Sequence, residues 1–95
     1  MLRTSVGETR LDILEWLKDP ADHFPPQSHG GGVERGVTVE AVAAKLGVPS
    51  AVAGTHLGLL ADMGLLTARR IGPRTYYRRD EVRIAEVARM FEKGW

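Results

Sequence analysis

The segment from residue 37 to residue 79 constrains the fold most, because two helical patterns and a hairpin pattern follow one another there without a break. Thr38 is a suitable cap for a first helix, and Gly47 is the residue type that ends one. After a tight turn, Pro49 and Ser50 open a second helix. The apolar side chains of this second helix are expected to face inward: Val52, Ala53, Leu57, Leu60 and Ala61.

The hairpin pattern is the most positively charged part of the chain. Thr67–Ile71 and Thr75–Arg78 have the residue types of two strands, and Gly72–Pro73–Arg74 has those of the turn between them. Residues 66–79 contain five arginines and no acidic residue, whereas the net charge of the whole chain is only +1. This separation of charge favours an anionic partner, and we expect double-stranded DNA. An arginine-rich hairpin without a partner is the alternative.

Length and composition limit the remaining possibilities. The 95 residues suit one domain, 1–95, in which the Pro- and Gly-rich segment 19–36 is expected to be a long loop. The absence of cysteine excludes disulfides and thiolate metal sites. No apolar run reaches membrane-spanning length and no leader pattern opens the chain, so a cytoplasmic protein with no membrane partner is expected. No enzyme motif accompanies the three histidines, so neither catalysis nor a cofactor is predicted.

Two further apolar helices are expected at the ends of the chain. The first runs from about Gly7 to Lys18, and the last begins after Asp80, which is a good helix cap. The last helix carries more apolar side chains than a thin core can cover, so both helices are expected to pack on a second copy of the chain. The predicted dimerisation residues are Leu11, Leu14, Trp16, Ile84, Val87 and Phe91. The alternative is that both helices only complete the core of a monomer.

The segment from Val37 to Arg79 resembles the winged helix-turn-helix of the bacterial arsenic-repressor-type (ArsR/SmtB) transcriptional regulators. The motifs that carry the resemblance are Leu46–Gly47, His56–Leu57, Gly64–Leu65–Leu66, Gly72 and Tyr76–Tyr77. The resemblance implies a mainly α fold with a small β-hairpin and with N- and C-terminal dimerisation helices. It also implies a homodimeric regulator, usually a repressor released by an effector, that binds a palindromic operator.

The chain departs from the family pattern at both familiar metal sites. Thr38 and Glu40 stand where metal-sensing members often have a Cys-x-Cys pair, and the helix after Asp80 contains no histidine. Sensing of a soft metal by the usual route is therefore not expected, and the effector stays unknown.

The second helix of the motif is the one expected to enter the major groove. Between Pro49 and Leu60 it has no Arg, Lys, Asn or Gln, the residues that usually read base edges. The expected DNA-binding residues are therefore Ser50, Val52, Thr55 and His56 on the helix, with Arg69, Arg70, Arg74 and Arg78 on the hairpin. His56 has a second reading, in which it braces the pair of helices through a backbone carbonyl.

Two other functions stay open. His23 and His29 lie in the long loop near Asp19, Asp22 and Glu34, and imidazole with carboxylate suits Ni or Zn, so a metal-responsive regulator is one alternative. The shortage of polar residues on the second helix makes a winged-helix protein–protein adaptor the other alternative.

Overall fold

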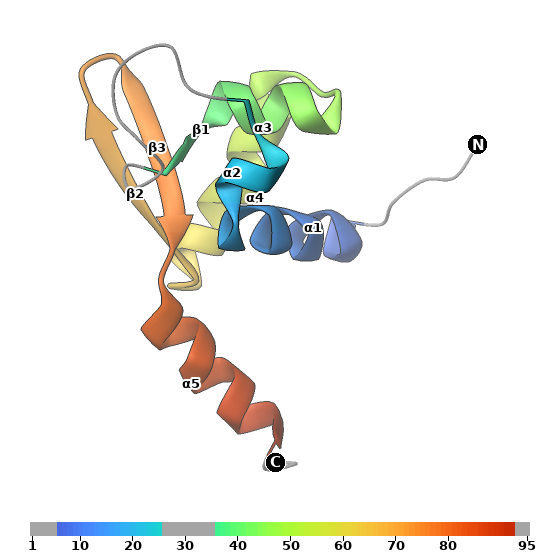
Figure 1. Ribbon diagram of the computed structural model, residues 1–95, viewed down its shortest axis with the longest axis vertical. Coiled ribbons are helices and arrows are strands. Elements are labelled where there is room, and N and C mark those ends of the chain that lie inside the picture. Colours follow the sequence, from blue (N-terminus) through green and yellow to red (C-terminus); the bar gives the residue numbers. More distant parts are fainter. Residues whose placement is uncertain (1–5, 26–35, 93–95) are drawn as a thin grey trace.

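The computed structural model describes residues 6–25 and 36–92 (Figure 1). Two helices precede the gap in this description, and a short strand, two helices, two strands and a last helix follow it. In chain order the elements are α1 (Val6–Lys18), α2 (Pro20–His23), β1 (Val37–Thr38), α3 (Val39–Leu46), α4 (Ser50–Asp62), β2 (Leu66–Ile71), β3 (Arg74–Arg79) and α5 (Glu81–Glu92). Within the described residues, no helix has the length and apolar character needed to cross a membrane.

The helix pair α3–α4 has the ends that its sequence predicts. The Thr38 hydroxyl accepts a hydrogen bond of 3.2 Å from the Ala41 amide and so caps α3. Gly47 ends α3 with φ at 72°, and its amide donates to the Ala43 carbonyl at 2.9 Å. Pro49 stands directly before α4. The predicted helices and the tight turn between them are confirmed.

The sheet contains one strand more than the sequence predicts. The strand order is β1-β3-β2, and both pairings are antiparallel. Strand β1 is only two residues long, Val37 and Thr38, which is too short for a period-2 pattern to identify it. Gly36 brings the chain alongside β3 with φ at +94°, in the region that favours glycine.

Three smaller expectations are corrected. The segment 19–36 was expected to be all loop, but Pro20 opens the short helix α2 as its first residue, a position that needs no amide donor. The hairpin turn consists of Gly72 and Pro73 alone, because Arg74 already pairs with Ile71 in the sheet. Val52 does not face inward: it is 43 % exposed, because it lies on the flank of α4 and not on the side that packs.

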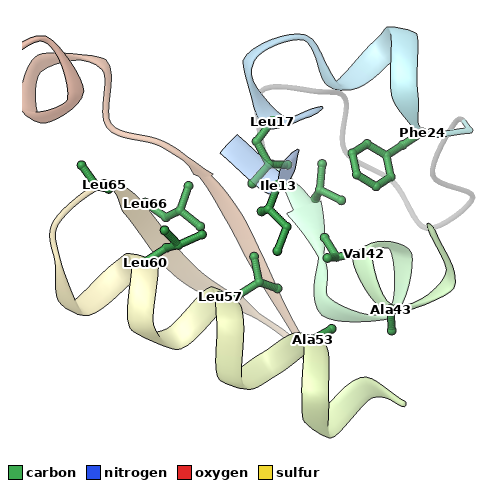
Figure 2. Packing of buried hydrophobic residues seen from close by; sticks show 11 residues of the cluster. Ile13, Leu17, Phe24, Val42, Ala43, Ala53, Leu57, Leu60, Leu65 and Leu66 are labelled. Carbon is green, nitrogen blue, oxygen red and sulfur yellow. The ribbon is translucent and has the colours of Figure 1, made fainter. Parts of the chain in front are cut away.

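An apolar core joins α1, α3 and α4 to one face of the sheet. Figure 2 shows Leu57 and Leu60 of α4 pointing toward Ile13 of α1. Ile13 and Leu57 have no exposed surface, and each such burial stabilises the fold by about 1.5–3 kcal/mol. The cluster consists of Ile13, Leu17, Phe24, Val37, Val42, Ala43, Ala53, Leu57, Leu60, Leu65 and Leu66.

Helix α5 leaves the body at the base of the hairpin. The Asp80 carboxylate accepts a hydrogen bond of 3.0 Å from the Arg83 amide, which confirms Asp80 as the predicted cap. Figure 1 shows α5 projecting away from the other helices, at the end of the molecule opposite the hairpin turn. Ile84 and Val87 are half-buried against the core, whereas Val82 and Met90 are exposed.

Gly36→Ala is expected to cost more stability than Gly47→Ala, although both glycines have positive φ. A Cβ at Gly47 meets nothing within 4 Å, so only the left-handed backbone cost of about 1–2 kcal/mol applies. A Cβ at Gly36 would lie 2.8 Å from the Tyr77 carbonyl carbon, which forces β1 away from β3. A loss of roughly 3 kcal/mol or more is expected for Gly36→Ala. Urea unfolding of both variants measures this, and equal losses would contradict the tight β1–β3 approach.

Candidate nucleic-acid interface

The pairing of β2 with β3 sorts the hairpin arginines between two faces of the sheet. Residues paired across antiparallel strands point to the same face, and successive residues alternate. The pairs Arg69↔Tyr76, Thr67↔Arg78 and Ile71↔Arg74 therefore place Arg69, Arg74 and Arg78 on one face. Leu66 and Ala68 lie on the other face, and Leu66 belongs to the core. The three exposed arginines therefore lie on the outer face, opposite Leu66, which they share with the buried Tyr76.

Arg70 lies on the opposite face of the sheet from the other exposed arginines. It pairs with Thr75 and shares the face of Leu66, near the turn end of the hairpin, where it remains exposed. No carboxylate in the described parts of the chain pairs with Arg69, Arg70 or Arg74. The positive charge of the turn half of the hairpin is therefore not neutralised by these residues.

Arg79, the fifth arginine of the hairpin, is held by contacts within its own chain. Its Nε lies 3.0 Å from Oε2 of Glu81, and its Nη1 donates to the Leu14 carbonyl at 3.0 Å. Only 12 % of its side chain is exposed. Arg79 thus ties the end of β3 to α1 and to the first turn of α5, so its positive charge is already engaged within the chain.

The outer surface of α4 is polar-poor and built from small side chains. Ser50, Ala51, Val52 and Thr55 are exposed, while Ala53 and Leu57 are buried. The Thr55 hydroxyl donates to the Ala51 carbonyl of its own helix at 3.0 Å. Ala51, which the sequence did not single out, lies four residues before Thr55 and therefore shares its exposed side of α4.

His56 lies partly buried on the flank of α4. Its Nδ1 atom is inaccessible to solvent and has no hydrogen-bond partner among the residues described. The predicted brace to a backbone carbonyl is therefore not made at Nδ1.

The predicted dimerisation residues of α1 fall on two sides of the helix. Leu11 is 65 % exposed, and the half-buried Leu14 lies next to it on the helical surface. Trp16 is on the other side, where its ring meets that of Phe24 edge-on at 6.3 Å and lies 5.0 Å from the ammonium nitrogen of Lys45. Contacts within its own chain therefore cover much of Trp16. On α5, Ile84 and Val87 share one half-buried face, while the Phe91 side chain lies outside the described residues.

The loop candidates for metal binding are not brought together in the described residues. His23 is exposed at the end of α2, and His29 lies outside the description. No group of three or more His, Cys, Asp or Glu side chains that could hold a metal occurs in residues 6–25 and 36–92. The pKa of Asp19 is raised, mainly by a hydrogen bond with Asp22 and by repulsion from the same carboxylate, an effect that His23 opposes.

Two helices joined by a tight turn and followed by a charged hairpin define a winged helix-turn-helix protein, in which the hairpin is the wing. A solved structure named "Crystal structure of Possible transcriptional regulator for arsenical resistance" superimposes on 92 % of this chain and 75 % of its own, with a TM-score of 0.68 and 26 % identity. The Bacillus subtilis (strain 168) protein named "Uncharacterized HTH-type transcriptional regulator YbzH" is 42 % identical over 82 residues, which are 86 % of this chain and 82 % of that protein.

The chain therefore belongs to the HTH-type transcriptional regulators. No family model matches the sequence. Because its relatives are regulators, the prediction that the chain is not an enzyme is confirmed. The predicted winged helix-turn-helix fold is confirmed as well.

Arg79→Ala is expected to destabilise the fold by about 2 kcal/mol, because it removes a charged donor from the Leu14 carbonyl and the partner of Glu81. Arg69→Ala is the matched control: it removes the same charge at an exposed position and should change stability by less than about 0.5 kcal/mol. The free energy of unfolding in urea measures both. Similar values for the two variants would show that Arg79 has no structural role.

Proposed function

We propose that this protein is a DNA-binding transcriptional regulator of the arsenic-repressor type. Helix α4 enters the major groove, and the wing holds the adjoining phosphates. The single observation that carries the proposal is the grouping of Arg69, Arg74 and Arg78 on the outer face of the wing. Strand β2 of that wing packs against α4, so one rigid unit presents both elements.

Electrostatics supports phosphate as the partner of the wing. Guanidinium groups bind phosphate through paired donors, and each phosphate neutralised by a protein cation releases condensed counterions. Arg70 is proposed to add a further phosphate contact on the opposite wing face. On α4, the proposed DNA-contacting residues are Ser50, Val52, Thr55 and His56.

The arsenic-repressor assignment rests on the resemblance of motifs and on the solved neighbour, which is named for arsenical resistance. Because neither familiar metal site of that family is found in the sequence, we propose no metal effector.

A homodimer is the form that we propose for binding a palindromic operator. Leu11 is largely exposed on α1, and α5 projects from the body with its Ile84–Val87 face only half-buried (Figure 1). A second copy that covers Leu11, Leu14, Ile84 and Val87 would bury this surface and present two wings to a two-fold site. The resemblance to the arsenic-repressor family favours a repressor as the role of the bound dimer.

An exposed apolar flank on α4 favours the adaptor as a second candidate. Leu59 and Met63 are 39 % and 55 % exposed, and a protein partner could cover them. Binding to duplex DNA that weakens steeply with salt separates the two candidates, because an apolar protein interface lacks that dependence.

Arg74→Ala is expected to weaken binding to all DNA sequences alike and to lower the slope of log affinity against log salt by roughly 0.9 per subunit. Arg89→Ala on α5 is the control, because it removes the same charge from an exposed position far from the wing turn. Fluorescence anisotropy at several salt concentrations measures both slopes. If Arg74→Ala and Arg89→Ala leave equal slopes, the wing does not hold phosphate.

Leu11→Asp is expected to shift the protein from dimer to monomer, because it places a carboxylate in the proposed interface without disturbing the core. Val82→Asp is the matched control: Val82 is 73 % exposed and lies on the side of α5 away from Ile84 and Val87. Sedimentation equilibrium gives the mass of each variant. A dimeric Leu11→Asp protein, or a monomeric wild type, would contradict the proposed interface.

A further inference from the structure

The surface that α4 would present to a groove offers almost no hydrogen-bond donor. The helix contains no Arg, Lys, Asn or Gln, and its outward residues in the first two turns are Ser50, Ala51, Val52 and Thr55. Arg, Lys, Asn and Gln make most paired hydrogen bonds to bases. The usual chemistry of base recognition is therefore missing from the element that should read the sequence.

The hydroxyl of Thr55 does not fill this gap. Its hydrogen is donated to the Ala51 carbonyl at 3.0 Å, which leaves only the oxygen lone pairs and the methyl group for an outside contact. Ala51 and Thr55 are four residues apart, so their methyl groups lie together on one face of α4. Val52 is next to them and is 43 % exposed. The exposed side of α4, with the flank that adjoins it, thus presents a small group of methyls.

Gly58 continues the same face one turn further along. A Cβ there would meet nothing within 4 Å, and its φ does not require glycine. Glycine inside a helix is unfavourable, and packing within the subunit gives no reason for it at this position. A glycine here lets another body approach the helix backbone closely. The charged wing beside α4 indicates that this body is DNA.

Apolar side chains have one specific partner in the major groove, the 5-methyl group of thymine. We propose that α4 recognises its operator chiefly through thymine methyl groups, which are contacted by Ala51, Val52 and the methyl of Thr55. This inference rests on the proposed DNA-binding function and names the chemical group that the same site reads. Phosphate contacts from the wing supply affinity, and the methyl contacts supply sequence preference.

The first experiment selects bound sequences from a random duplex library and then replaces each enriched thymine by deoxyuridine, which lacks only the 5-methyl group. Thymine is expected at the positions facing α4. Each contacted thymine that becomes uracil should weaken binding about fourfold, the effect of exposing one methyl-sized apolar group. The salt dependence should not change, because no phosphate contact is altered.

Two matched variants test what the Thr55 side chain contributes to the methyl contact. Thr55→Val keeps the methyl and removes the hydroxyl, whereas Thr55→Ser keeps the hydroxyl and removes the methyl. The valine variant should retain the preference for thymine over uracil. The serine variant should bind the thymine duplex about fourfold more weakly and bind the uracil duplex as the wild type does, so that the two changes are not additive. Circular dichroism verifies that both variants keep their helices.

The outcomes separate the inference from the proposed function. If no duplex binds in a salt-dependent way, the proposed function fails and the inference fails with it. If duplexes bind but the deoxyuridine duplex binds as tightly as the thymine duplex, DNA binding stands and recognition through methyl groups is overturned. The same conclusion follows if the Thr55→Ser variant keeps the preference for thymine and the Thr55→Val variant loses it.

Discussion

Burial of the inner side of α4 is the constraint on which the rest of the structure depends. Ala53, Leu57 and Leu60 are almost completely buried against α1 and the sheet (Figure 2), so rotation of α4 about its axis would expose them to water. Once these three residues face inward, helical geometry directs Ala51 and Thr55 outward. The same core includes Leu66, the first residue of the wing, so the position of the wing relative to α4 follows from the same burial. One apolar cluster therefore orients both elements of the candidate interface.

Electrostatics divides the wing into a structural end and an exposed end. At the base, Arg79 is enclosed by the Leu14 carbonyl and the Glu81 carboxylate. Toward the turn, Arg69 and Arg74 are exposed and unmatched by any carboxylate of the described residues. A charge with partners in its own chain is less available to a polyanion than an exposed one. The arginines of one short segment therefore differ in their contacts, although their sequence context is nearly the same.

Much of the fold could be predicted from local patterns. The caps at Thr38 and Asp80 and the stop at Gly47 are short-range signals, because each depends on hydrogen bonds within one turn of a helix. Strand β1 could not be predicted, since two residues carry no period and its pairing with β3 joins segments about forty residues apart along the chain. The exposed position of Val52 was missed for a related reason: an apolar side chain at helical spacing indicates a buried face without showing where that face ends.

The properties of the candidate site likewise fall into those that the sequence determines and those that only the tertiary structure decides. The sequence by itself determined the helix–turn–helix–hairpin order, the cluster of arginines between residues 66 and 79 and the absence of Arg, Lys, Asn and Gln from α4, because composition and short-range spacing carry that information. Only the tertiary structure decided which arginines share a face, that Arg79 is held by α1 and α5, and that the Thr55 hydroxyl is already bonded. Those properties depend on strand register and on contacts between distant segments. Burial of the apolar core selects this register and these contacts, and local sequence does not encode them.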